Sequence, residues 1–186
     1  MMAKDAKIEI ERDVRTFANL YHGSLVLLER SKDYPEGGYY ALLGSMLFTA
    51  FTFEAFLNHL GKEKIEDWER IDREPVMKKY SVLCDKFDIT RDPSRRPYQT
   101  LKNLFGFRDN LAHGRTEKLQ VNKNVNIKDD ILSHTPKTKW EKYCNEENAV
   151  RARADVERVI VELNQAAGGE KDPFTMGMTV STMSSR

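Results

Sequence analysis

The feature that most constrains the fold is a run over residues 39–60 that is apolar on almost every side of a helix. A helix of this kind has to be surrounded either by protein or by lipid. The run carries one acid, Glu54, with Asn58 and His59 close behind, and no second apolar span accompanies it. A charge inside a membrane span is unfavourable. We therefore expect no membrane partner but a central helix, ended by Gly61 and wrapped by the other helices.

Amphipathic stretches on both sides supply the helices that would surround the central one. Apolar residues recur at three- and four-residue steps over 5–31, 65–88, 97–113 and 145–167. The turn-forming residues of 34–38 end the first stretch. Pro75 begins or kinks a helix, Pro97 begins one, and Asn145 followed by two acids is typical of a helix cap. The pattern predicts an all-α bundle of four to five helices.

Two segments lack the helical pattern. Over residues 115–145, apolar and polar residues alternate weakly, which favours either a short β-hairpin around 122–124 or an extended excursion. Residues 168–186 are rich in Gly, Ser, Thr and Met and show no pattern, as in a disordered tail. We expect a single helical domain over 1–167, with a loop or short-strand excursion before the last helix, and a disordered tail over 168–186.

Composition limits the classes of function. Thirty basic and 29 acidic side chains give a net charge of +1, so any surface that binds anions must be a local patch. Cys84 and Cys144 have neither zinc-site spacing nor the number needed for a disulfide framework. We expect no metal and no cofactor. The first residues lack the apolar core of a secretory signal, which indicates a cytoplasmic protein.

A pair of opposite charges stands at positions where the helical pattern calls for apolar residues. Arg108 lies on the apolar stripe that runs from Leu101 to Leu111, and Glu54 lies on a stripe of the central helix. An unpaired buried guanidinium is strongly unfavourable. We expect Glu54 and Arg108 to pair in the core or in a cleft; the alternative is that each side chain reaches solvent separately.

Polar residues cluster at the end of the same helix. His113 lies in the last turn, where the helix dipole favours the protonated imidazole, and Gly114 is a natural C-cap. Asp109 shares a helix face with His113 and could hydrogen-bond to it, and Asn110 could orient a phosphate or the imidazole. On an ideal helix Arg108 and His113 lie about 140° apart. Either the last turn is distorted, or a second copy of the chain completes the site.

These residue types suit the cleavage of RNA without a metal. The 2′-hydroxyl is the internal nucleophile, so the site needs a base, an acid and a cation for the phosphoryl charge. Histidine transfers protons near neutral pH. Arginine stays charged and donates two parallel hydrogen bonds to a phosphate.

The sequence Phe-Arg-Asp-Asn-Leu-Ala-His-Gly over 107–114, at a helix end and after a central helix with an embedded acid, resembles the signature of the HEPN superfamily of small helical domains. Many members are metal-independent ribonucleases whose paired domains build one composite site. The resemblance covers residues 5–167. It places Arg108 and His113 at the two defining positions, Asp109 at the commonly polar position after the arginine, and Glu54 at the acidic position of the second helix.

The resemblance implies a homodimeric, metal-independent endoribonuclease of toxin or phage-defence type, with RNA as substrate and an antitoxin or regulatory protein as a further partner. His113 would be the general acid and base, Arg108 the phosphate clamp, Asp109 and Asn110 positioning residues, and Glu54 the partner that orients Arg108. Two alternatives stay open. One is a non-catalytic HEPN-like module that binds RNA, a nucleotide or a protein in the same cleft. The other is an interaction domain in which Arg108 and His113 only satisfy buried hydrogen bonds.

Overall fold

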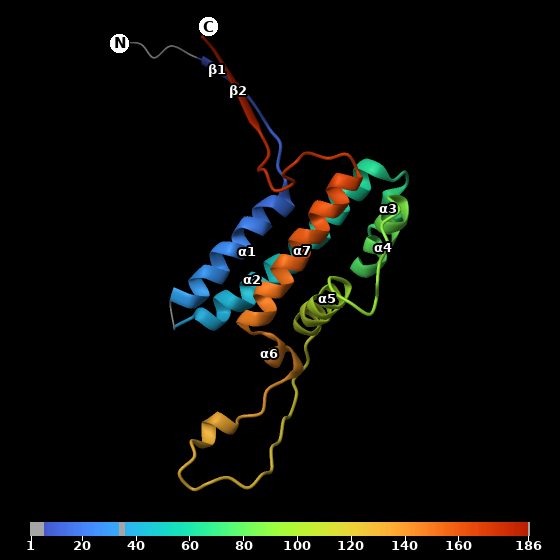
Figure 1. Cartoon of the computed structure of the whole chain (residues 1–186). Coiled ribbons are helices and arrows are strands. Elements are labelled where there is room, and N and C mark those ends of the chain that lie inside the picture. The colour runs from blue at the N-terminus through green and yellow to red at the C-terminus, as the bar shows by residue number, and fades with distance from the viewer. Residues whose placement is uncertain (1–5, 34–35, 186) are drawn as a thin grey trace, which may run out of the picture.

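The computed structural model describes residues 6–33 and 36–185 of the chain. Helices form the body, so the predicted all-α class is confirmed (Figure 1). Five longer helices make up the bundle: α1 (Thr16–Asp33), α2 (Gly38–Lys64), α4 (Val76–Lys86), α5 (Tyr98–Ala112) and α7 (Glu146–Ala166).

Shorter elements complete the chain. They are α3 (Trp68–Ile71), the 3-10 helix η1 (Ile131–His134), α6 (Lys139–Tyr143) and the antiparallel strands β1 (Ala6–Arg12) and β2 (Thr179–Ser185).

Helix α2 is the centre of the bundle, as its sequence predicts. It packs against α1, α7, α4 and α5, and its residues Met46, Ala50, Phe53 and Leu57 are fully buried. By length and composition alone this helix is also able to cross a membrane, but 44% of its most apolar stretch is buried inside the protein. The surrounding helices therefore cover part of this apolar stretch, and part of it stays exposed.

The end of α2 differs from the prediction. The helix does not stop at Gly61 but continues to Lys64. A Cβ atom at position 61 would overlap the ring of Trp68, which is 4% exposed beneath α2. Glycine at this position permits the close approach of Trp68, and it does not terminate the helix.

The predicted starts of α4, α5 and α7 are confirmed. Helix α4 begins directly after Pro75 and α5 directly after Pro97. The side chain of Asn145 caps α7 by accepting a hydrogen bond of 2.9 Å from the backbone N–H of Asn148. Of the predicted turn at 34–38, residues 34–35 lie outside the described residues, and Gly37 adopts the left-handed conformation that glycine tolerates.

The helix predicted over 5–31 is wrong at its beginning. Residue 5 lies outside the described residues, Ala6–Arg12 form β1, and α1 begins only at Thr16. Ile8 and Ile10 alternate with charged residues, so the two-residue period of a strand is present in the sequence. The strand pairs with β2, and Ile8 lies opposite Met183.

The disordered tail predicted over 168–186 is also corrected. Phe174 is 6% exposed and stacks on Tyr21 of α1, with ring centroids 3.7 Å apart. Its carbonyl oxygen lies 3.2 Å from a ring nitrogen of His22. Residues 179–185 then form β2 and extend beyond the bundle as a ribbon with β1 (Figure 1). The partner strand lies at the other end of the sequence, which is why local pattern did not reveal the pairing.

The excursion before the last helix is an extended loop, one of the two predicted alternatives. Residues 114–130 contain neither helix nor strand, and the hairpin expected around 122–124 is not formed. The loop leaves the bundle at the end opposite the ribbon, then returns through η1 and α6 (Figure 1). Helix α6 packs against α5, which places the end of the excursion beside the helix that carries Arg108.

Candidate functional site

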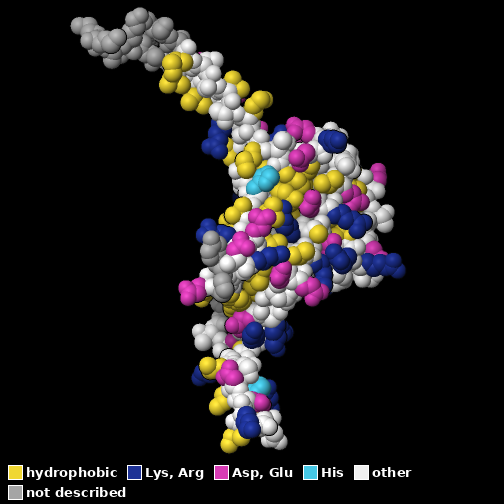
Figure 2. Space-filling view, turned by 60° about the vertical axis from the view of Figure 1, so that its left-hand side comes forward, with side chains coloured by type: hydrophobic (Ala, Val, Ile, Leu, Met, Phe, Trp, Pro, Cys, Tyr) yellow, Lys and Arg dark blue, Asp and Glu magenta, His cyan; other side chains and the backbone are white. Residues whose placement is uncertain are grey.

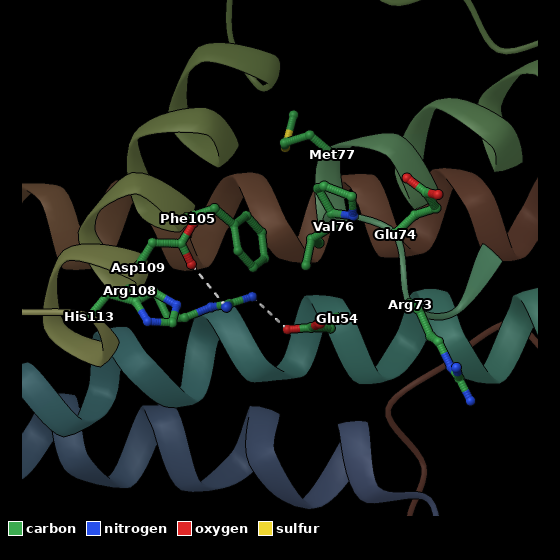
Figure 3. Close-up of a pocket in the computed structure, with 10 residues that line it drawn as sticks. Glu54, Arg73, Glu74, Val76, Met77, Phe105, Arg108, Asp109 and His113 are labelled. Atoms are coloured by element: carbon green, nitrogen blue, oxygen red, sulfur yellow. Dashed lines mark hydrogen bonds and ion pairs between the residues drawn. The ribbon is translucent and has the colours of Figure 1, made fainter. Parts of the chain in front are cut away.

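Arg108 faces a cleft between α2, the start of α4 and the last turns of α5 (Figure 3). The cleft has a volume of about 390 Å³ and receives charged side chains of both signs. Its lining consists of Glu54, Arg73, Glu74, Pro75, Val76, Met77, Phe105, Arg108, Asp109 and His113.

The guanidinium of Arg108 is held by two carboxylates. Its Nη2 donates a 2.8 Å hydrogen bond to Oε2 of Glu54, and its Nη1 lies 2.9 Å from Oδ1 of Asp109. The group also lies over the ring of Phe105, 5.3 Å from the ring centroid. The predicted pairing of Glu54 with Arg108 is therefore confirmed, and the guanidinium is fixed at the wall of the cleft with 21% of the side chain exposed.

A buried lysine, which the sequence reasoning missed, completes this charged cluster. Lys79 of α4 is 2% exposed; its Nζ donates to Oδ1 of Asn58 at 3.0 Å and lies 3.6 Å from Oε1 of Glu54. Glu54 thus lies between two cations, one on α4 and one on α5. The signal was present in the sequence, because Lys79 lies on the apolar stripe of α4 that contains Val76 and Leu83.

His113 lines the same cleft as Arg108 and lies just outside the regular helix. It is the C-terminal capping residue of α5, with φ −114° and ψ 15°, and its backbone N–H donates to the Asp109 carbonyl at 2.9 Å. Both side chains line one cleft, although an ideal helix would place them about 140° apart. Figure 3 shows both side chains extending from the end of α5 into the cleft. Within the described part of the chain, the exposed imidazole makes no hydrogen bond or ion pair, so both ring nitrogens are accessible.

The sequence predicts Gly114 as the C-cap of α5, but the capping residue is His113, and Gly114 follows it without a left-handed conformation. Among the described residues, the glycines with positive φ are Gly37 and Gly168. A Cβ atom at Gly114 would lie 3.0 Å from the carbonyl oxygen of Asn110. Glycine here allows the chain to pass close to the last carbonyl groups of α5.

The other two predicted site residues take different positions from those expected. The carboxylate of Asp109 pairs with Arg108 and not with His113. The side-chain amide of Asn110 donates to the Gly106 carbonyl at 2.6 Å and lines a second cavity on the other side of α5. The structure therefore brings Glu54, Arg108, Asp109 and His113 together and leaves Asn110 outside the cleft.

The side chains that could bind a metal ion are dispersed in the described part of the chain. Over residues 6–33 and 36–185, no three or more His, Cys, Asp and Glu side chains are grouped so that they could hold a metal ion. Cys84 and Cys144 are free and buried, and burial raises the pKa of both thiols.

Comparison of the chain with protein-family models, with curated protein sequences and with solved structures finds no match. The chemistry of the cleft is therefore the basis for assigning a function.

Proposed function

We propose that this cleft is the active site of a metal-independent endoribonuclease of the HEPN class, of toxin or phage-defence type, which works as a homodimer. The observation that carries the proposal is the presence of Arg108 and His113 in one cleft, with Glu54 fixing the guanidinium. A phosphate clamp and a proton-transfer group at one surface are the two functions that RNA cleavage by its own 2′-hydroxyl requires.

In the proposed reaction the 2′-oxygen attacks the adjacent phosphorus, and the bond from phosphorus to the 5′-oxygen breaks. The products are a 2′,3′-cyclic phosphate and a 5′-hydroxyl. A histidine accepts the proton of the 2′-hydroxyl, and a histidine donates a proton to the leaving 5′-oxygen. The guanidinium of Arg108 stabilises the charge on the phosphoryl oxygens.

The ion pairs of Arg108 support this role because they differ in exposure. The Asp109 side chain is 55% exposed and that of Glu54 is 30% exposed. Exposed ion pairs are weak, and their carboxylates exchange readily with other anions. A substrate phosphate replaces Asp109 at Nη1, while Glu54 continues to hold Nη2.

Dimerisation fits the proton balance of the reaction. One imidazole cannot accept and donate a proton in the same step, so His113 of a second copy supplies the other transfer. The bundle also exposes apolar side chains that a partner could cover: Val26 of α1 is 54% exposed, and Phe48 and Phe51 of α2 are 36% and 39% exposed. The view that brings the α1 side forward shows hydrophobic side chains on the surface between charged ones (Figure 2).

The test is an RNA cleavage assay in excess chelator with the full chain and with His113→Ala. We expect fragments ending in 2′,3′-cyclic phosphate from the natural protein, and a rate about 10²- to 10⁴-fold lower for the variant. His59→Ala is the matched control, because His59 is also a partly exposed histidine but lies at a different cavity. Intact RNA with the natural protein, or equal cleavage by His113→Ala, would contradict the proposal.

A second candidate is a non-catalytic module that binds RNA, a nucleotide or a protein in this cleft. The charge balance favours it: Glu54, Glu74 and Asp109 offset Arg73 and Arg108, so the cleft has no excess of fixed positive charge. Retention of labelled RNA without strand scission in the same assay would support this candidate.

A further inference from the structure

A second cavity lies on the opposite side of α5 from the cleft, between α5 and α6. Its volume is about 340 Å³. The residues that line it are Lys102, Asn103, Gly106, Phe107, Asn110, Lys139, Trp140 and Tyr143. Neither the pairing of Arg108 nor the position of His113 uses any of these side chains.

The floor of this cavity is open because position 106 has no side chain. Gly106 lies in the interior of α5 with an ordinary backbone conformation, and a Cβ atom there would meet no atom within 4 Å. Glycine in a helix interior is less stable than alanine. Packing does not require glycine at this position, and its effect is to leave room above the helix backbone.

Aromatic rings form the wall opposite Gly106. Trp140 and Tyr143 are three residues apart on α6, and the Tyr143 ring lies 5.5 Å from the ring of Phe107. The capping box of Thr138 and Glu141 fixes the start of α6. Burial raises the pKa of Tyr143 to about 12, so its phenol stays protonated at neutral pH and can donate a hydrogen bond.

Hydrogen-bonding and cationic groups surround the open floor. Asn103 and Asn110 precede and follow Gly106 by three and four residues, so the two amides lie on the same face of α5. Lys102 and Lys139 are exposed at the rim. A flat aromatic ring with a polar edge and an attached anion matches this combination of groups.

We propose that this cavity binds a nucleotide. The base stacks against Trp140 over Gly106, the two amides read the base edge, and the lysines contact the phosphate. Both a nucleotide within single-stranded RNA and a free nucleotide carry this chemistry. The RNA source deepens the proposed function and rests on it, since a strand whose phosphate binds at Arg108 then places one of its bases in this cavity on the other side of α5.

The test is a titration of the full chain with each of the four ribonucleoside monophosphates and with single-stranded tetraribonucleotides that carry 2′-O-methyl groups to prevent cleavage. Tryptophan fluorescence is the readout, because Trp140 lines the cavity whereas Trp68, the other tryptophan, is buried under α2. We expect a saturable change with at least one ligand, absent in Trp140→Leu. Tighter binding of the RNA than of any monophosphate assigns the cavity to RNA, and equal binding assigns it to free nucleotides.

Variants at Gly106 separate binding from folding. Gly106→Ala is expected to raise Tm by about 1–4 °C, and Gly106→Leu, which fills the space above the floor, to weaken binding about 10-fold or more while the protein stays folded. His113→Ala keeps the nucleotide affinity of the natural protein, so loss of cleavage and loss of this site are distinguishable. The absence of a saturable change with every ligand, or unchanged affinity in Gly106→Leu, would overturn the inference.

Discussion

Two arginines of this chain, Arg153 and Arg108, lie on inward faces of helices. Different kinds of group accept the hydrogen bonds of their guanidinium groups. Arg153 of α7 is 9% exposed, donates a 2.7 Å hydrogen bond to the carbonyl of Tyr21, and lies over the Tyr21 ring at 4.0 Å. It also donates to the hydroxyl of Ser24. Arg108 of α5 contacts two carboxylates instead and faces a cleft, and its Nε is buried without a partner among the described residues.

The difference separates an arginine that joins helices from one that is available to a ligand. The partners of Arg153 are a backbone carbonyl, a hydroxyl and a ring of α1, which do not leave without unfolding the contact between α1 and α7. The partners of Arg108 are side chains, of which Asp109 is more than half exposed. An incoming anion can replace such a carboxylate, so of these two arginines it is Arg108 that combines a fixed guanidinium with an exchangeable partner.

The largest effect is expected for Arg108→Lys. Lysine keeps the charge beside Glu54 but lacks the planar fork that binds two phosphoryl oxygens. RNA cleavage should fall about 10²- to 10³-fold, the usual effect of removing one donor to a transition-state oxyanion. The measurement is the initial rate under excess chelator with folding checked by circular dichroism, and Arg153→Lys, measured per folded molecule, should cleave at the natural rate. Cleavage by Arg108→Lys at the natural rate would end the distinction between the two arginines.

The next effect is on stability and concerns Arg153→Ala. Removing the guanidinium takes one hydrogen-bond donor from the Ser24 hydroxyl and one from the Tyr21 carbonyl in a buried contact. The free energy of unfolding should fall by about 2 kcal/mol, and Tm by about 4–8 °C for a chain of this size. Thermal unfolding followed by circular dichroism measures the change. Arg108→Ala should lower Tm less, because its cleft admits water; an equal or larger loss would mean that Arg108 is mainly structural.

A third arginine, Arg96, extends the comparison to the pH dependence of stability. Asp155 of α7 is 4% exposed and accepts two hydrogen bonds from Arg96 at 2.8 and 2.9 Å. Burial by itself would raise the pKa of Asp155, but the hydrogen bonds from Arg96 and Thr100 bring this pKa below 3.8. A carboxyl whose folded pKa is depressed stabilises the fold above its unfolded pKa and loses that contribution as pH falls through the folded pKa.

Stability should therefore decline as the pH falls below about 4, and Asp155→Asn should be less stable at neutral pH with a weaker decline over that acid range. Urea unfolding between pH 7 and 3 measures both. If the free energy of unfolding fell in parallel with pH for the two proteins, Asp155 would not contribute to the loss of stability in acid.

The smallest effect is expected for Asp109→Asn. The change removes the exchangeable carboxylate from Nη1 of Arg108 and leaves Glu54 in place. Because exposed ion pairs are worth at most about 1 kcal/mol, KM for RNA should fall about two- to fivefold with little change in kcat. Steady-state kinetics on a labelled oligoribonucleotide give both constants, and a rise in KM would show that Asp109 assists RNA binding.

The sequence predicted those site residues whose charge interrupts the apolar stripe of a helix. Glu54 and Arg108 each occupy an apolar stripe, and mutual pairing resolves both exceptions. The same rule applies to Lys79 on the shorter α4, but its partner Asn58 lies on α2 and is not revealed by the pattern of α4 itself. Residues that meet only through tertiary packing were not predictable in this way. Asn110 and Trp140 share a cavity because α6 returns to α5 after the excursion, and no local period encodes that return.

The two strands escaped prediction for a related reason. Ile10 fits both the two-residue period of β1 and the helical spacing that continues into α1, so the pattern alone does not choose between them. The choice depends on β2, whose polar sequence carries little strand signal and whose partner lies more than 160 residues away.

The exposed stretch at 114–130 divides the chain into two pieces that contribute different parts of the site and of the core. Everything before it contains Glu54, Arg108 and His113, whereas α7, which covers both α2 and α5, lies after it. Backbone cleavage within this stretch would cut no helix or strand. Expressed as separate halves, the pieces could reassemble through the contacts of α7 and the pairing of β1 with β2. The first half would hold the proposed catalytic groups without the helix that completes their core, so under the proposed function RNA cleavage would report on reassembly.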